Sequence, residues 1–315
     1  MSGPDAGKIG ARVSMLIRDE DGSRRELLGR LLTTSSVLKR DLTEVNFDSA
    51  RVISWRVVPE QPLRKPTSSL IREIERASSA TWPAVEVVKI GGWELRASDG
   101  FTQRANSVLP IGAPPFGEPS GDLAAALKDV VDFYCSRGLT PRFQVPLPSY
   151  AALDAALDIE GWQSKFSVSV QICDLSGLAI KSQHLVEITA LPDGEWLALY
   201  QRPLGRDGFA VLTGSDAFFA TIRKIDPTTG DHVVAAIGRA ATFEGWCGIS
   251  AIRTAEQFQR KGLAKSIVRS LAQRAESFGA ERAFLQVSAD NAPAVALYQR
   301  LGFTEHHTYN YRSLA

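Results

Sequence analysis

The chain has 315 residues, a length that predicts about two or three domains. Hydrophobic residues make up 44% and charged residues 23%, which excludes disorder over most of the chain. The 36 basic and 35 acidic side chains nearly cancel, so nothing favours a nucleic acid or an anionic membrane as partner. There is no apolar run long enough for a transmembrane helix and no signal-peptide core at the N-terminus, so we expect a cytoplasmic protein.

The cysteines and histidines give no sign of a disulfide framework or a metal centre. The three cysteines are scattered and form no CxxC pair. His306 and His307 are adjacent, and neighbouring residues of a strand point to opposite faces. We therefore expect two solvated histidines, and no metal.

The first segment, residues 1–62, is predicted to be a small all-β unit. Strands are expected over Ile9–Arg18, Glu26–Thr34 and Arg51–Val58, with a turn after the first. The pattern resembles a Src-homology-3-like barrel, and prolines at 59, 62 and 66 predict a linker after it. Residues 1–60 hold ten Lys/Arg and nine Asp/Glu, so we expect an accessory module, which packs or forms a homodimer, and not a nucleic-acid binder.

The rest of the chain contains an internal repeat. Sliding the sequence by 141 residues places Gly121 on Gly262 and Gly161-Trp162 on Gly302-Phe303. Each copy is predicted to run helix, strand, helix and then Gly-aromatic. In the second copy, apolar residues recur at helical spacing: Leu263, Ile267, Leu271, Ala275 and Phe278. We expect two α/β halves, residues 63–180 and 181–315.

The copies differ at the loop before the first helix of each. The second copy has Gln259–Ala264 after a predicted strand over Trp246–Thr254, and the first has Glu118–Leu123. Backbone amides at a helix N-terminus bind phosphate oxygens. Gly262 lets the backbone approach closely, and Arg260 and Lys261 add positive charge. The first copy lacks these cations and carries acids, so it is predicted to repel a phosphate. Neither a Walker loop nor a dinucleotide fingerprint is present at this junction.

Two motifs here resemble the GNAT acyltransferase superfamily. Its acyl-CoA loop, [QR]xxGx[GA], is matched by Gln259, Gly262 and Ala264. The stretch from Asp290 to Phe303 is similar to its second signature, N-x-x-A-x-x-L-Y-x-x-L-G-F. The resemblance implies the α/β acyl-CoA N-acyltransferase fold in tandem, with mixed central sheets flanked by helices and a degenerate first half. The arrangement is also similar to an actinobacterial group of unassigned substrate.

The resemblance also implies roles for individual residues in binding acetyl-CoA. Its pyrophosphate would lie on the amides of the loop, and its pantetheine arm would pair with the strand before the loop. Asn291 would bond the pantetheine or cap the following helix. The implied cofactor-binding residues are Ile252, Arg253, Thr254, Gln259, Arg260, Lys261, Gly262, Leu263, Ala264, Lys265, Asn291 and Tyr298.

Tyr298 is the implied catalytic acid, which protonates the leaving thiolate; without the motif it would read as a core aromatic. Backbone amides near Ile252 would stabilise the oxyanion. The base is not readable from the sequence. Glu244 and Ser250 are candidates, although Glu244 also fits a hairpin turn. Cys247 reads as a buried structural thiol.

The sequence therefore predicts an acetyl-CoA-dependent N-acetyltransferase acting on a primary amine, of a small molecule or a protein. Two alternatives stay open: a CoA-binding regulatory protein without catalysis, and a nucleic-acid-associated enzyme guided by the first unit. The degenerate half, including Trp93–Arg96 and Arg104–Ser107, either walls the acceptor pocket or serves as a scaffold. Trp82, Trp93 and Trp162 are expected in the core.

Overall fold

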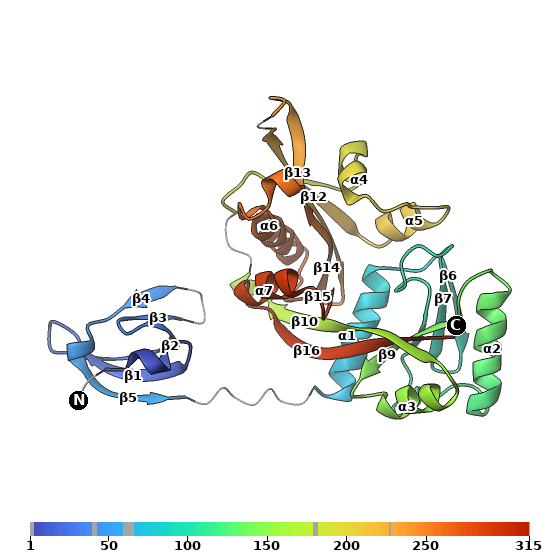
Figure 1. The fold of residues 1–315 in the computed structure, drawn as a ribbon, viewed down its shortest axis with the longest axis horizontal. Coiled ribbons are helices and arrows are strands. Elements are labelled where there is room, and N and C mark those ends of the chain that lie inside the picture. Colours follow the sequence, from blue (N-terminus) through green and yellow to red (C-terminus); the bar gives the residue numbers. More distant parts are fainter. Residues whose placement is uncertain (1–2, 40–42, 59–65, 179–181, 227, 315) are drawn as a thin grey trace. The chain divides into compact units, whose positions relative to one another are not determined.

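The computed structural model describes residues 3–39, 43–58, 66–178, 182–226 and 228–314 (Figure 1). The chain forms two compact units, Met1–Lys65 and Pro66–Ala315, which are described separately. The domain boundaries expected at 62/63 and at 180/181 both lie outside the described residues. Among the described helices, none is long and apolar enough to cross a membrane.

The first unit is an antiparallel sheet of five strands in the order β4-β3-β2-β1-β5. Alternate residues of β1, namely Val13, Met15 and Ile17, are buried and form its core with Leu27 and Leu31. The predicted barrel is not confirmed, because no pairing closes this sheet within the described residues. Three strands were expected, and two very short ones, β3 and β4, were missed. The elements are η1 Ala6–Lys8, β1 Arg12–Arg18, β2 Arg24–Thr33, β3 Ser36–Leu38, β4 Glu44–Asn46, η2 Ser49–Arg51 and β5 Val52–Val57.

The second unit is built on one mixed sheet of eleven strands, in the order β11-β12-β13-β14-β15-β10-β16-β9-β8-β7-β6. Among the described strands, only β14–β15 and β8–β9 pair in parallel. The strands are β6 Glu86–Ile90, β7 Trp93–Ala97, β8 Val108–Pro110, β9 Arg142–Leu147, β10 Gln163–Asp174, β11 Glu187–Thr189, β12 Ala217–Ile225, β13 His232–Phe243, β14 Trp246–Thr254, β15 Arg282–Ser288 and β16 Thr304–Ser313. The helices are α1 Ser68–Thr81, α2 Leu123–Cys135, α3 Ala151–Ile159, η3 Leu175–Gly177, α4 Gly194–Tyr200, α5 Gly208–Thr213, η4 Glu256–Phe258, α6 Leu263–Ser277 and α7 Ala292–Arg300.

The two copies of the repeat have the same order of elements: α2, β9 and α3 in the first, α6, β15 and α7 in the second. The matched glycines adopt the same left-handed conformation, with φ of 74° at Gly121 and 77° at Gly262, and 81° at Gly161 and 94° at Gly302. Only glycine adopts such a φ without strain. The tandem arrangement predicted from the repeat is therefore present.

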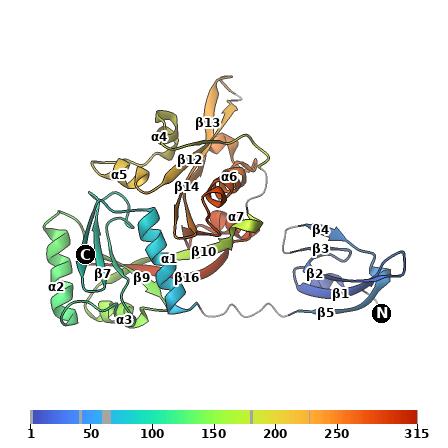
Figure 2. The same cartoon turned by 180° about the vertical axis from the view of Figure 1, so that it is seen from behind.

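The last strand of each copy lies beside the other copy. β10 follows α3 of the first copy but pairs with β15 of the second, for example Val168 with Ser288. β16 follows α7 of the second copy but pairs with β9 of the first, where Arg312 faces Phe143. The two long strands run side by side between the halves (Figure 2). This exchange joins both copies in one sheet.

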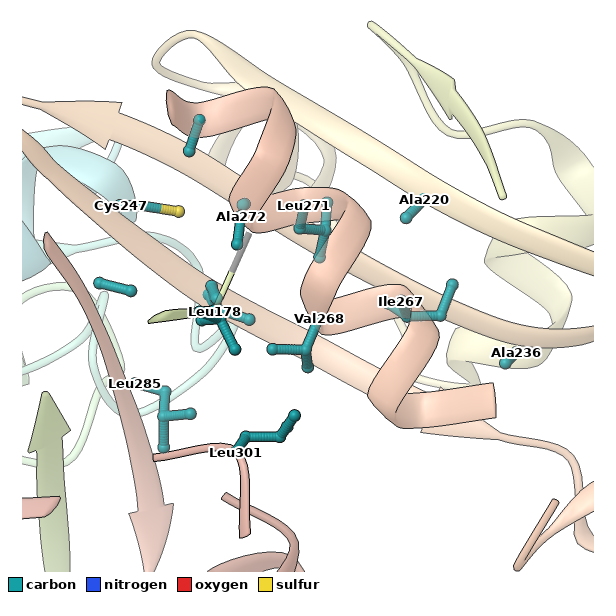
Figure 3. Packing of buried hydrophobic residues seen from close by; sticks show 14 of the residues in the cluster. Leu178, Ala220, Ala236, Cys247, Ile267, Val268, Leu271, Ala272, Leu285 and Leu301 are labelled. Atoms are coloured by element: carbon teal, nitrogen blue, oxygen red, sulfur yellow. The ribbon is translucent and has the colours of Figure 1, made fainter. Parts of the chain in front are cut away.

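Helices cover both faces of the sheet in the second copy. α6 packs through Ile267 and Leu271 against Ala220 and Ala236, and this core also encloses Cys247 (Figure 3). The neighbouring residues Phe219 and Ile237 point the opposite way, because side chains alternate along a strand, and pack with α4 and α5. The predicted apolar stripe of α6 is confirmed except at its end, where Phe278 is 56% exposed. Trp82, Trp93 and Trp162 are buried, as predicted.

Candidate functional site

The loop between β14 and α6 is held in shape by one buried ring and two left-handed residues. β14 begins and ends at the predicted residues, and Phe258 of η4 then anchors the loop in the core at 4% exposure. Arg260 has a φ of 60° and Gly262 a φ of 77°. Gly262 is the N-cap of α6, and no side chain caps this helix. The N-terminus of α6 is therefore left open.

Six consecutive backbone amides, those of residues 260–265, donate to no acceptor among the described residues. A Cβ placed on Gly262 would meet nothing within 4 Å, so the backbone at this residue is open to a ligand. Lys261 holds its ammonium 5.3 Å from the centre of the Phe258 ring. Its carbonyl accepts a hydrogen bond from His184 Nε2 at 3.1 Å. Unpaired amides, a helix N-terminus and two cations together can bind an anion.

A mainly apolar cavity of about 570 Å³ adjoins this loop. The loop contributes Phe258, Lys261 and Leu263 to its wall, and the rest comes from His184, Arg223, Lys224, Ile225 and His232. Arg223 is neutralised by Glu187, Asp193 and Glu195, whereas Lys224 and Lys261 have no ion-pair partner among the described residues. The loop therefore lies at the rim of a cavity with a positive edge.

β14 and β15 part in the middle of the sheet. Their parallel pairing ends at Ile249 and Leu285, and beyond this point β14 pairs only with β13. A bulge follows at once, where Ala251 has a φ of 54° and the register with β13 shifts. A bulge leaves one residue unpaired and bends the strand. Gly238 faces the bulge, and a Cβ there would lie 2.7 Å from Ile252 Cδ1 and clash with Ile267.

α7 carries the second predicted group of residues. Asn291 is its N-cap and accepts a hydrogen bond from the Ala294 amide at 3.2 Å. Tyr298 is half-buried against the α6 core, with its ring centre 5.9 Å from that of Phe303. Burial raises the pKa of Tyr298 to about 12, so the phenol stays protonated. Its hydroxyl has no hydrogen-bond partner within the described ranges.

The structure does not bring Glu244 together with these residues. Glu244 has a φ of 45° and forms the β13–β14 turn with Gly245. It lies at the opposite end of β14 from the loop, and eight extended residues separate it from Ile252 by about 26 Å along the strand. Ser250 lies nearer the bulge, where its hydroxyl accepts from Arg239 at 3.4 Å. Cys247 is fully buried, and burial raises its pKa to about 12, as befits a structural thiol.

A second cavity, of about 360 Å³, opens at the bulge itself. Its wall is made of Tyr200, which ends α4, of the next three residues, Gln201, Arg202 and Pro203, and of Ala251, Ile252 and Arg253. Tyr200 packs with Ala251 and Trp82 on the sheet face opposite α6. No local motif marks these residues, and the sequence reasoning missed them apart from Ile252 and Arg253.

The expectation of two solvated histidines was wrong. His307 is 4% exposed, and its Nε2 donates to the buried Glu75 at 2.9 Å. The Nδ1 atoms of His306 and His307 are 2.9 Å apart, because the register between β10 and β16 shifts at His306. Burial, and then His307, lower the pKa of His306 to about 4. Among the described residues, no three His, Cys, Asp or Glu side chains are grouped as metal ligands.

Comparisons with known proteins agree with these features. Residues 67–312 match the family described as probable histone acetyltransferase Rv0428c C-terminal. The chain is 30% identical over 319 residues to a probable histone acetyltransferase of Mycobacterium tuberculosis, covering 96% of this chain and 94% of that protein. It is 32% identical to an uncharacterized N-acetyltransferase of Bacillus subtilis, over 77% of this chain and 98% of that protein.

A solved structure shares the fold of the second unit. It is a GCN5-related N-acetyltransferase from Kribbella flavida, which aligns with a TM-score of 0.59 and 15% sequence identity. The alignment covers 78% of this chain and 96% of that one. At this identity the likeness shows the fold alone. The structure thus has the mixed, helix-flanked sheet of acyl-CoA N-acyltransferases.

Proposed function

We propose, from the premise that this chain belongs to the Rv0428c C-terminal family and is a GNAT-type N-acetyltransferase, that it transfers acetyl from acetyl-CoA to a primary amine. One observation carries the proposal: six unpaired amides lie at the N-terminus of α6, where Gly262 adjoins open space. Such a row is costly to leave without acceptors in a folded protein unless solvent or a ligand supplies them. Acetyl-CoA offers the acceptors in its pyrophosphate.

The loop would bind this pyrophosphate through residues 260–265, with Gln259 opening the loop. Arg260 and Lys261 add charge without closing the space, because both side chains lie at the exposed rim. The first amides of α6, from Leu263 to Lys265, point along the helix axis, where the helix dipole favours negative charge. The apolar cavity beside Phe258 gives the rest of the nucleotide a surface to lie on.

The edge of β14 after Ile249 would receive the pantetheine arm. Here β14 has lost β15 as a partner, and Ile252, Arg253 and Thr254 lead directly to the loop. The bulge at Ala251 turns one amide out of the ladder, which suits the carbonyl oxygen of a thioester. We assign to this amide the stabilisation of the oxyanion that forms when the amine attacks.

Tyr298 would donate its proton to the departing thiolate. Its phenol is protonated at neutral pH and half-buried. The hydroxyl makes no hydrogen bond to another described residue. Asn291 caps α7 and so fixes the helix that carries Tyr298. No side chain is assigned as the base. Glu244 stands at the far end of β14, and an ordered water can take the proton of an ammonium group.

Calorimetric titration of the purified chain with acetyl-CoA tests the proposal. We expect one site per chain, in keeping with one open helix N-terminus in the second copy. Thiol release with a panel of amines then tests transfer. Two sites would overturn the degenerate assignment of the first copy. Binding without transfer to any amine would favour the CoA-binding regulator, and absence of binding would remove the loop from the function.

A further inference from the structure

Four arginines surround the cavity at the bulge. Arg202 and Arg253 line it directly. Behind it, on the same face of the sheet, the guanidinium carbons of Arg239 and Arg104 lie 4.7 Å and 5.5 Å from the centre of the Trp82 ring. Arg239 is 1% exposed and also reaches Ser250, the residue before the bulge. Positive charge therefore gathers where an acceptor would meet the thioester.

None of the four has a carboxylate within 4 Å among the described residues. Arg239 donates only to neutral oxygens, those of Leu212, Gly214 and Ser250. The buried Nε of Arg104 has no hydrogen-bond partner at all. Some arginines of the unit are neutralised, as Arg206 is by Asp207 at 2.9 Å and Arg312 by Asp154 at 2.8 Å, whereas these four are grouped and have no such partner within the described ranges. The buried charge of Arg239 is costly to hold without an anion nearby, whereas Arg202 and Arg253 are exposed.

Tyr200 shows that three of these charges act on one place. Burial raises the pKa of its phenol, while Arg202, Arg104 and Arg239 each oppose that rise. Burial and then Arg104 lower the pKa of Arg239, because two like charges lie close together. No acidic side chain contributes to either effect. The cavity wall at Tyr200 is thus a region of positive potential.

We propose that the acceptor is a primary amine that also carries an oxyanion, a carboxylate or a phosphate, which Arg202 binds at the cavity wall and Arg104 attracts from behind it. This rests on the proposed function and names its substrate class. Guanidinium groups bind such oxyanions through paired hydrogen bonds. Arg239 is too buried to contact the ligand, so it acts only by raising the positive electrostatic potential at the cavity. One relative is named a probable histone acetyltransferase, but a basic protein acceptor would bring like charge to this wall and be repelled.

The test compares amines that differ only in charge, with acetyl-CoA saturating. The pairs are 4-aminobutyrate with 4-aminobutanamide, and phosphoethanolamine with ethanolamine; a lysine-rich peptide is the third arm. We expect kcat/KM at least about tenfold higher for the anionic member of one pair, and a weaker preference at high salt. The pair that responds identifies carboxylate or phosphate. Preference for the neutral members or the peptide would overturn the inference.

Arg202→Gln and Arg104→Gln should each reduce the anionic preference by about fivefold or more while leaving neutral amines unchanged. Arg206→Gln is the matched control, because Arg206 follows in the same segment but is neutralised by Asp207. A preference that survives both variants would refute the assignment. Calorimetry with the same amines on the CoA-loaded protein measures amine binding without turnover.

Failure of the proposed function would show separately, as absence of acetyl-CoA binding. Absence of amine binding to a CoA-loaded protein would count against the inference alone.

Discussion

Helices α2 and α6 begin within one position of each other in the aligned copies, yet their N-termini are satisfied in different ways. At α2 the carboxylate of Asp122 accepts a hydrogen bond from the Ala125 amide at 2.7 Å. At α6 the cap is Gly262, which has no side chain to accept one. In the first copy the carboxylate of Asp122 therefore occupies the helix N-terminus, where an anionic ligand would otherwise bind. The comparison shows how a single cap residue decides whether a helix N-terminus is a site.

The surroundings of the two helix N-termini differ as well. The loop before α2 folds onto the β6–β7 turn, where the Gly92 amide donates to the Glu118 carbonyl at 2.7 Å. Tyr150, the counterpart of Asn291, is buried, and its hydroxyl donates to the Gly112 carbonyl at 2.8 Å. Leu157 is fully buried at the position of Tyr298. The first copy thus has buried side chains of its own at the positions of Asn291 and Tyr298, although the space at Gly121 is as open as that at Gly262.

The largest effect should come from giving the second copy the carboxylate of the first. Gly262→Asp places a negative charge among the unpaired amides and should weaken acetyl-CoA binding by about a hundredfold or more, measured by calorimetry. Gly121→Asp is the matched control, with the same strain from a φ of 74°. Both variants should lose about 1 kcal/mol of stability, but only the first should lose binding. Equal affinity in the two would refute the binding loop.

Tyr298→Phe should lower kcat by about tenfold or more and keep acetyl-CoA affinity within about threefold, because only the proton donor is lost. Stability should change little, since this hydroxyl has no partner among the described residues. Tyr150→Phe sharpens the contrast: it removes a buried hydrogen bond and should cost about 1 kcal/mol of stability with little change in kcat. Steady-state kinetics measures kcat, and chemical denaturation measures the free energy of unfolding. An unchanged kcat in Tyr298→Phe would remove the residue from the mechanism.

The pH dependence of kcat gives a further check on Tyr298. A phenol with a pKa of about 12 stays protonated, so the acid form is lost only above that value. We expect no alkaline fall in kcat below about pH 10 from this group. A fall that is centred near pH 8 and disappears in Tyr298→Phe would contradict the raised pKa.

Arg260→Gln and Lys261→Gln should each weaken acetyl-CoA binding by only about three- to tenfold, because exposed charges are screened. The loss should shrink as salt is raised. Lys128→Gln in α2 serves as the control, since this exposed lysine lies in the first copy and pairs with Asp132. A loss independent of salt would mean that the side chains shape the loop and do not act through charge.

The smallest effect is expected at Glu244. Glu244→Gln keeps the turn at the start of β14 and should leave kcat within about twofold, because the residue lies about 26 Å along the strand from Ile252. Thiol release with any accepted amine measures this. A tenfold loss together with the disappearance of the acidic limb of the pH profile would restore Glu244 as the base.

Much of the fold and of the site was readable from local sequence. The repeat predicted two copies with matched glycines, which the structure shows in the same left-handed conformation, and the bounds of β14 were predicted without error. The apolar stripe of α6 and the capping role of Asn291 could also be predicted from residues nearby in the chain. Such features depend on contacts within a few positions of the chain, so propensity, capping and periodicity suffice to predict them.

Other features were decided by the tertiary structure. These features depend on residues that lie far apart in the chain. They are the exchange of β10 and β16, the open first sheet, the parting of β14 from β15, and the burial of His307 beside Glu75. Trp82, Arg104, Tyr200 and Arg239 come from four separate elements and meet only because α4 and the first copy cover one face of the sheet. No local pattern encodes such pairs, because they result from burial and register over the whole sheet.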